Sequence, residues 1–312
     1  MDDPHGGSLG TAIPDDLRIL VDCRWLGCSG IGRSTELFLR ALRSSPPPGR
    51  WILWGDCAHL GWRGAEVRPH RRDPRAVLGQ LGALERPAHD VALYLPQIRP
   101  AGRRPSVQVL HDVTPIEDER RRGRRLLLRT YFRRLARATE VLACSPAAAS
   151  DLRRVLDVPA GRRRVFTYPV DRDLQRRVEA LRAGHRAERK VLFIGRVAPH
   201  KNLGRLIQAH SSSEWSRSGG QLVLAGPGTE ALDDAVRGVS GLGAVSQPDL
   251  DLLLATSLAL VLPSLREGFG LPVLEGRAAG LPVLASARAP ISDHLEAGYD
   301  RSFDPLNVLA IA

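Results

Sequence analysis

The chain has 312 residues, of which 43% are hydrophobic, and it carries a formal net charge of +11 at pH 7. This length suits two domains, and the apolar content excludes a disordered chain. The longest apolar stretch, residues 252–263, is interrupted by two hydroxyl residues and is too short to span a bilayer, and the acidic N-terminus lacks the apolar core of a secretory signal. Metal-binding spacing is absent from the four cysteines, so we expect a reducing, cytoplasmic location: Cys23, Cys28, Cys57 and Cys144.

Charge is distributed unevenly along the chain. The excess of basic residues lies before Lys190, and from Lys190 onward acidic residues slightly outnumber basic ones. Such asymmetry suggests two domains that meet different partners.

Short apolar runs alternate with helix-like segments in the first part of the chain. Strands are predicted at residues 18–25, 51–54, 91–95, 107–110, 141–143 and 164–168, and helices at 34–43, 124–137 and 147–155. The polar, arginine-rich stretch 175–189 is predicted to be an interdomain helix or linker.

A second series of the same kind begins at Lys190. Its predicted strands are 190–194, 222–225, 258–262 and 282–285, and its predicted helices are 203–210, 231–237, 250–254 and 272–279. Alternation of this kind is typical of parallel α/β sheets. The simplest architecture is two doubly wound, Rossmann-like domains facing across a cleft, with ligands outside the carboxyl ends of the strands.

The loop after the first predicted strand is rich in glycine. Gly27–Thr35 reads GCSGIGRST, and Gly30 and Gly32 would let the backbone approach an anion at the start of the following helix. The spacing differs from the dinucleotide pattern G-x-G-x-x-G, so a nicotinamide site with Asp56 as its ribose-binding acid has little support. An ordinary turn that needs glycine explains the same residues equally well.

Two cations flank the loop after the strand at 190–194. In FIGRVAPHKN, Arg196 follows the strand and Lys201 opens the next helix. Two fixed cations suit a diphosphate, and a solvated basic turn is the alternative.

Two glutamates bracket the segment EGFGLPVLE at residues 267–275. Gly268 and Gly270 end the preceding apolar run, and the proline suits the first turn of a helix. Glu267 and Glu275 can each accept two hydrogen bonds from the vicinal hydroxyls of a sugar or ribose. Attraction of both acids to the positive helix end is the alternative, and it explains Glu275 better than it explains the glycines.

Several of these motifs together resemble the GT-B glycosyltransferases of family 4, also called glycosyl transferases group 1, and mannosyltransferases among them. The resemblance lies in VLFIGRVAPHKNLGRLIQA and PSLREGFGLPVLEGRAAGLPVLAS, and it extends to SGIGRSTELFLRAL, HDVTPIED, ACSPAAASDL and AGPG. It touches most of residues 18–305, and the E-x7-E motif of the family matches the two glutamates. It implies an acceptor-side domain over residues 1–180 and a donor-binding domain over residues 181–312.

A reaction is implied by the same resemblance. The enzyme would be a retaining hexosyltransferase that takes a sugar, mannose as first choice, from a nucleoside diphosphate without a metal or another cofactor. The acceptor would be a glycan, a lipid-linked molecule or a small molecule. It would attack from the leaving-group face, with the departing phosphate taking the proton, so that no protein base is required. Preorganised positive charge would stabilise the leaving diphosphate.

Residue roles follow from position in these motifs. Arg196 and Lys201 would hold the donor diphosphate, and Glu275 would bind the ribose hydroxyls. Gly30 and Gly32 would close over the donor from the other domain.

The predicted catalytic residues are His111 and Glu267. His111 would face the sugar near the reacting carbon, although a histidine after a strand is often simply packed. Glu267 would hold the transferred hexose together with the backbone of four residues: Gly268, Phe269, Gly270 and Leu271.

The chain departs from the family pattern at three points. Asp293 stands where relatives usually have a glutamate, and Gly276–Arg277 replaces a small and apolar pair. Relatives continue through further helices after the segment that matches DPLNVLAIA, so we expect a shortened C-terminal domain.

A basic helix is predicted over residues 121–138. Its apolar residues recur at helical spacing, with arginines on other faces, and they are Leu127, Leu128, Tyr131, Phe132 and Leu135. Either the helix buries these apolar residues against the protein and exposes its basic side to solvent, or it binds anionic lipid as a peripheral contact at the inner face of the plasma membrane.

Two other classes of function compete with the transferase. The net charge permits nucleic-acid binding, but aromatic residues make up only 5% of the chain and no nucleic-acid module is present, so we expect no specific nucleic-acid partner. A noncatalytic GT-B-like scaffold is the second rival, because the shortened C-terminus leaves activity open.

Overall fold

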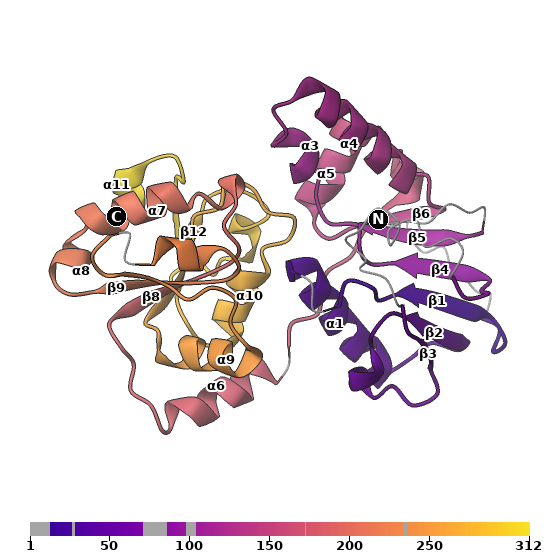
Figure 1. The fold of residues 1–312 in the computed structure, drawn as a ribbon, viewed down its shortest axis with the longest axis horizontal. Coiled ribbons are helices and arrows are strands. Elements are labelled where there is room, and N and C mark those ends of the chain that lie inside the picture. Colours follow the sequence, from indigo (N-terminus) through magenta and orange to yellow (C-terminus); the bar gives the residue numbers. More distant parts are fainter. Residues whose placement is uncertain (1–12, 27–28, 71–85, 98–103, 172, 234–235) are drawn as a thin grey trace, which may run out of the picture. The chain divides into compact units, whose positions relative to one another are not determined.

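The computed structural model describes residues 13–26, 29–70, 86–97, 104–171, 173–233 and 236–312. The described chain forms two compact units. One comprises residues up to Val109 with Arg137–Glu140, and the other comprises Leu110–Ala136 with Val141–Ala312. Two parallel sheets organise the chain, as Figure 1 shows. The N-terminal segment that bears on the secretory-signal prediction lies mostly outside the described residues.

The first sheet has seven strands in the order β3-β2-β1-β4-β5-β6-β7. Their bounds are β1 Arg18–Asp22, β2 Arg50–Trp54, β3 Glu66–Arg68, β4 Val91–Tyr94, β5 Ser106–Leu110, β6 Glu140–Ala143 and β7 Arg163–Val165. β1 pairs in parallel with β2 and β4, and its residues from Ile19 to Asp22 are buried. Buried apolar runs of this kind are typical of central parallel strands.

Among the described residues, the helices of this part of the chain are α1 Ser29–Ser44, α3 Thr114–Glu117, α4 Arg122–Leu135 and α5 Pro146–Leu156. Short 3-10 turns lie at Ala58–Leu60 and Ala160–Arg162. Helix α5 begins as its sequence predicts, because the Ser145 hydroxyl accepts a hydrogen bond from Ala148 N and Pro146 occupies the first turn.

The second sheet has six strands in the order β10-β9-β8-β11-β12-β13. Their bounds are β8 Lys190–Ile194, β9 Gln221–Ala225, β10 Val239–Gly241, β11 Ala259–Leu262, β12 Val283–Ser286 and β13 Arg301–Phe303. Every registered pair is parallel. The prediction of doubly wound parallel α/β architecture is therefore confirmed for both sheets.

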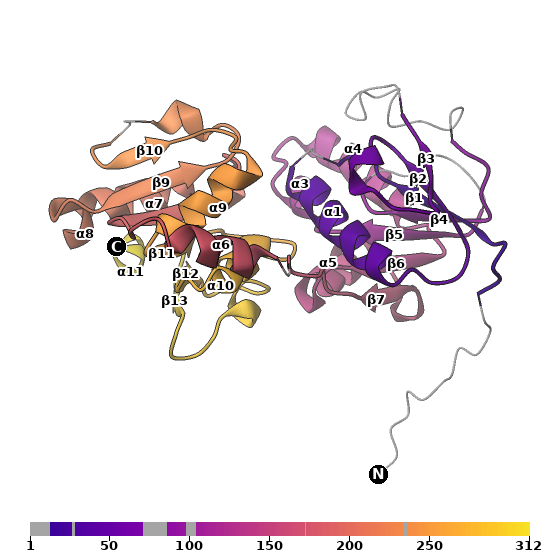
Figure 2. The ribbon, with the colours of Figure 1, turned by 90° about the horizontal axis from the view of Figure 1, so that it is seen from below.

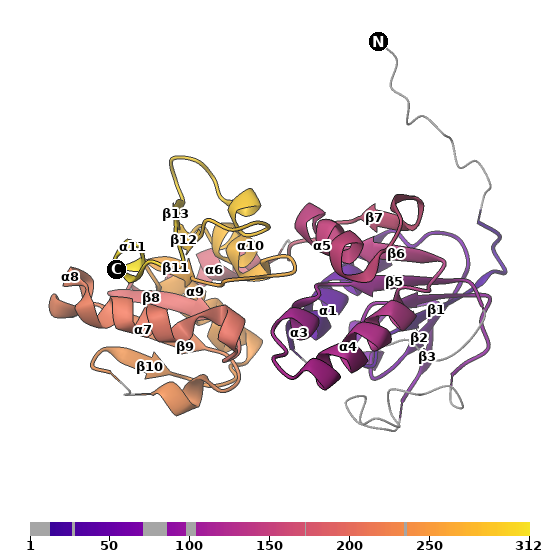
Figure 3. The ribbon, with the colours of Figure 1, turned by 90° about the horizontal axis from the view of Figure 1, so that it is seen from above.

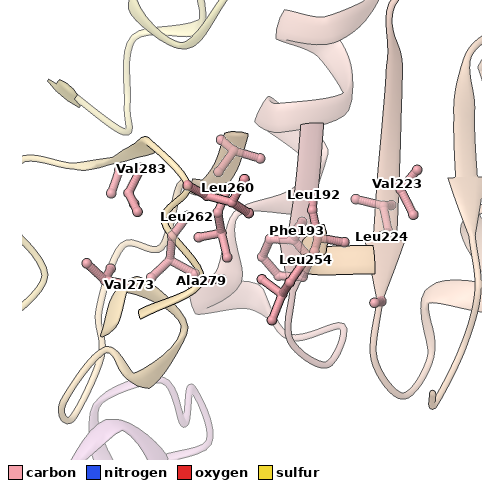
Figure 4. Packing of buried hydrophobic residues seen from close by; sticks show 14 of the residues in the cluster. Leu192, Phe193, Val223, Leu224, Leu254, Leu260, Leu262, Val273, Ala279 and Val283 are labelled. Atoms are coloured by element: carbon pink, nitrogen blue, oxygen red, sulfur yellow. The ribbon is translucent and has the colours of Figure 1, made fainter. Parts of the chain in front are cut away.

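Helices cover both faces of the second sheet. They are α6 Leu174–Arg182, α7 Leu203–Ser212, α8 Glu214–Arg217, α9 Gln247–Thr256, α10 Leu271–Ala278 and α11 Val308–Ile311, with 3-10 turns at Pro199–Lys201, Thr229–Leu232 and Ser292–His294. Figures 2 and 3 show α7 on the face opposite α6 and α9. The core between the sheet and α9 and α10 contains Leu192, Phe193, Leu254, Leu260 and Val273 (Figure 4).

The first part of the stretch predicted as an interdomain helix or linker forms α6, Leu174–Arg182, which packs in the core of the second sheet. Leu174 and Val178 of α6 are fully buried. Arg177 Nε donates to an oxygen of Asp251 on α9 at 2.6 Å, and Asp251 is itself buried. The polar composition misled the prediction, since two apolar residues four positions apart are enough to dock a short helix.

The prediction of a helix at residues 231–237 is wrong for the residues of that range that the structure describes. A 3-10 turn covers Thr229–Leu232 and β10 begins at Val239. The three-residue strands β3, β10 and β13 and the short helices α3 and α8 were not predicted. The boundary between domains at residue 180 and the shortened C-terminal domain stay predictions.

A membrane-spanning helix is absent from the described residues, because none of their helices combines sufficient length with sufficient apolarity.

Candidate functional site

The segment between β11 and α10 carries two of the predicted site residues on a fixed backbone. Gly270 precedes α10 with φ of 90°, a conformation that favours glycine, and Pro272 lies in the first helical turn. The strand, loop and helix predicted from this segment are confirmed. Glu275 lies within α10 and is only 4% exposed. A buried carboxylate needs compensating partners, so its position is tightly specified.

Lys201 and Glu267 form an ion pair. Lys201 Nζ lies 2.5 Å from Glu267 Oε1, and both side chains are 12% exposed. The Ser264 hydroxyl donates to the same carboxylate oxygen at 2.7 Å. Lys201 and Glu267 were predicted to have separate roles, and in the structure they form one charge-assisted couple.

Three further hydrogen bonds explain why this couple forms. The Asn202 side chain donates to Pro263 O at 3.2 Å and to Pro305 O at 2.7 Å, and Leu265 N donates to His200 O at 2.7 Å. The loop after β8 is thereby attached to the loop after β11. Because these strands are neighbours in the sheet, their carboxyl-end loops meet at one edge.

Arg196 lies in the same β8–α7 loop, two residues after the strand. Its backbone is fixed on both sides, since Gly195 N donates to Ala225 O and Val197 N donates to Pro227 O. The Arg196 side chain is exposed and forms no ion pair within the described part of the chain. It is a free cation, whereas Lys201 is already matched by a carboxylate.

The residues between the two glutamates are held by packing and by their carbonyl groups. Gly268 O accepts hydrogen bonds from Ser145 Oγ at 2.8 Å and from Cys144 Sγ at 3.2 Å. Phe269 is buried, and its ring lies edge-on to His294 at a centroid distance of 4.9 Å and to Tyr168 at 5.8 Å. Leu271 is the first residue of α10 and is half-buried.

His111 directly follows β5 and is buried, with 7% of its surface exposed. Its ring is parallel to that of Tyr168 at a centroid distance of 5.6 Å, and its carbonyl accepts from Cys144 Sγ at 3.0 Å. These contacts fit the packed reading of the histidine, and its catalytic role stays a prediction.

Gly30 and Gly32 do not lie in a loop. Helix α1 begins at Ser29, five residues before the predicted start, so both glycines occupy its first turns. The hydroxyls of Ser34 and Thr35 donate to the carbonyls of Gly30 and Ile31, four residues earlier. Their contact with a donor stays a prediction, and Gly27 and Cys28 lie outside the described residues.

Several residues of this neighbourhood were not predicted as site residues. Asn202 joins the two loops, and Ser264 donates to Glu267 within the loop after β11. Tyr168 and His294 pack on Phe269. Asp293, the expected counterpart of the family glutamate, is exposed in the turn at Ser292–His294. Serine two residues after a buried strand was a usable signal, whereas the aromatic contacts join residues too distant in sequence to be predicted from spacing.

Protonation of His294 should make the stability of the folded protein depend on pH. Burial lowers the pKa of His294, partly offset by its hydrogen bond to Phe269 O, from which Nε2 lies 2.8 Å. Because the folded pKa lies below the unfolded value, the unfolded chain binds more protons, and stability falls as pH decreases from about 7 through the unfolded pKa of about 6.5. We expect urea-unfolding measurements between about pH 7.5 and 5 to show a smaller loss of stability in His294→Gln than in the wild type.

The comparison of the two proteins removes the contributions of His89 and His210. Burial lowers the pKa of both, so they add a loss of the same sign to each protein. Parallel stability profiles for the wild type and His294→Gln would contradict the assignment to His294.

A metal centre is not formed by the described residues, among which no group of three or more His, Cys, Asp and Glu side chains is placed to hold an ion. Metal independence of the reaction stays a prediction.

A family model matches the second part of the chain. The model for glycosyl transferases group 1 matches residues 178–305, the stretch that contains Arg196, the Lys201–Glu267 couple and Glu275. Residues 178–305 are a glycosyl transferases group 1 domain. The family predicted from the motifs is confirmed for this group 1 domain.

Relatives and solved structures extend the comparison. The chain is 38% identical over 107 residues to O-antigen chain mannosyltransferase B of Escherichia coli, covering 30% of this chain and 28% of that protein. It is 32% identical over 107 residues to O-antigen chain mannosyltransferase RfbU of Salmonella typhimurium, covering 32% of this chain and 30% of that protein. The matches thus span less than a third of these curated relatives.

The fold is shared with Anabaena Alr3699/HepE, solved in complex with UDP and glucose. The TM-score is 0.69 at 20% identity, over 95% of this chain and 88% of that one. The predicted GT-B fold is therefore confirmed, and the group 1 domain is its second α/β part.

Proposed function

We propose that the chain is a retaining glycosyltransferase that moves a hexose from a nucleoside diphosphate to a glycan acceptor. The observation that carries the proposal is the Lys201–Glu267 ion pair, to which Ser264 donates a hydrogen bond. Glu267 lies three residues before Gly270, the N-cap of α10, and α10 contains the buried Glu275. A cation, carboxylates and unpaired N–H groups at a helix start are the groups that bind phosphate and sugar hydroxyls.

Each group has a part in the proposed reaction. Arg196 and Lys201 bind the diphosphate, whose negative charge grows as the anomeric C–O bond breaks. Glu267 exchanges part of its contact with Lys201 for the hydroxyls of the hexose, and Glu275 binds the ribose. The acceptor attacks from the leaving-group face, and the departing phosphate takes its proton, so no protein side chain acts as nucleophile.

The substrates are proposed from the relatives. Mannose carried by guanosine diphosphate is the first choice, because the curated relatives are named mannosyltransferases. A uridine diphosphate sugar is the second, because the HepE structure holds UDP and glucose. A lipid-linked surface glycan is the proposed acceptor, and the enzyme works in the cytoplasm at the inner face of the membrane.

Thermal stabilisation by sugar nucleotides tests the proposal. We expect GDP-mannose or UDP-glucose to raise the melting temperature more than NAD does, and release of free nucleotide with glycan extracts to continue in EDTA. Absence of any shift with sugar nucleotides would refute donor binding. Binding without nucleotide release would favour a noncatalytic scaffold, and loss of activity in EDTA would contradict metal independence.

A further inference from the structure

A pocket lies between α3, α4 and α5, and neither Lys201 nor Glu267 lines it. Its volume is about 330 Å³, and four arginines line it: Arg122, Arg125, Arg129 and Arg154. Glu117 is the one acidic residue of the lining. Pockets of this composition bind anions.

The acid in this pocket is already neutralised. Arg154 contacts Glu117 at 2.6 Å and also contacts Asp151 at 2.6 Å, and Arg266 contacts the second Glu117 oxygen at 2.5 Å. The other three arginines form no ion pair with any described residue. The pocket therefore keeps an excess of positive charge that internal partners do not match.

Arg129 gives the clearest indication that this pocket binds an anion. Its side chain is half-buried, and its Nε is buried without a hydrogen-bond partner. A buried donor without an acceptor costs about 1–3 kcal/mol, and a phosphate oxygen in the pocket would satisfy it.

Two leucines adjoin the pocket on the same helix. Leu126 is 65% exposed and lines the pocket, and Leu127 is 72% exposed. Phe132 and Leu135, later in α4, are buried against the protein. The helix thus buries Phe132 and Leu135 of the predicted stripe, whereas Leu127 of that stripe and the neighbouring Leu126 are exposed among arginines.

We propose that this end of α4 is a membrane-binding surface that takes an anionic phospholipid. The lipid phosphate lies in the arginine pocket, and Leu126 and Leu127 enter the boundary between headgroups and acyl chains. Exposed leucines beside unmatched arginines are the pattern of interfacial helices on anionic membranes. A nucleic acid would use the cations but gain nothing from the leucines. The proposal does not depend on the identity of the sugar donor.

Vesicle co-sedimentation of the full chain tests this surface. We expect binding to vesicles of phosphatidylcholine mixed with phosphatidylglycerol, and little binding to phosphatidylcholine alone. Arg125→Gln with Arg129→Gln, and separately Leu126→Ser with Leu127→Ser, should each lower the partition coefficient by roughly tenfold or more. The control, Arg63→Gln with Arg186→Gln, removes the same charge from exposed positions elsewhere and should change it by less than about twofold.

The variants separate the alternatives. Equal losses in the control and the Arg125/Arg129 variant would show a general effect of net charge and overturn the site. Wild-type binding by the leucine variant would overturn insertion. Soluble glycerol phosphate that binds equally to the wild type and the leucine variant, without vesicle binding, would show a soluble-anion site instead. Because the leucines are exposed, their replacement tests the surface even if Arg129→Gln disturbs folding.

Discussion

Replacement of Lys201 by alanine is expected to weaken sugar-nucleotide binding by about 10- to 100-fold, the effect of one or two charge-assisted hydrogen bonds. In the structure Lys201 is one of two cations on the β8–α7 loop and contacts Glu267 directly. Titration calorimetry with the sugar nucleotide that gives the largest thermal shift provides the measurement. Glu275→Ala, measured in the same way, should also weaken sugar-nucleotide binding, because Glu275 is the proposed partner of the ribose hydroxyls.

A double-mutant cycle distinguishes donor binding from folding. Lys201→Ala leaves the Glu267 carboxylate with only the Ser264 hydroxyl, and this should cost about 1–3 kcal/mol of unfolding free energy. Adding Glu267→Gln removes the unpaired charge, so most of that stability should return. Donor affinity should not return if both side chains bind the donor as proposed.

The opposite result would contradict the proposed roles. If affinity recovers together with stability in the double variant, Lys201 acts only by holding the loop. If neither Lys201→Ala nor Glu275→Ala changes donor affinity, the donor site lies elsewhere in the chain.

The regular elements of the second sheet could be predicted from the sequence because their signals are local. The buried run at Ala259–Leu262, the positive-φ Gly270 and Pro272 specify a strand, a turn and a helix start over a few residues. Strand β10 and the turn at Thr229–Leu232 lack such signals. A three-residue edge strand has too few positions to show alternation, and its pairing with β9 is set by the rest of the sheet.

The site residues could be predicted individually, but their couplings could not. Lys201 and Glu267 were both identified, whereas their ion pair depends on Asn202, which joins the two loops from a position 61 residues before Pro263. The start of α1 was placed too late because glycine is a weak helix former, yet the helix begins at Ser29 and includes Gly30 and Gly32.

Substitution of Gly226 by alanine is expected to destabilise the group 1 domain by about 2–4 kcal/mol, because two penalties add. Its φ of 142° is rarely adopted by other residues, and an added Cβ would lie 2.3 Å from Gly195 O. On either side of this contact, Gly195 N donates to Ala225 O and Val197 N donates to Pro227 O. The clash would therefore displace the loop that carries Arg196. We therefore expect lower donor affinity as well as a lower urea midpoint.

Gly204→Ala is the matched control, since Gly204 lies in α7 with no atom within 4 Å of an added Cβ. Alanine there should raise stability by about 0.5–1 kcal/mol, because it is the better helix former. If Gly226→Ala is as stable as Gly204→Ala, the backbone contact between Gly226 and Gly195 does not hold the loop. If Gly226→Ala loses stability but keeps wild-type donor affinity, the position of Arg196 does not control diphosphate binding, and the role of that cation must be assigned to another residue.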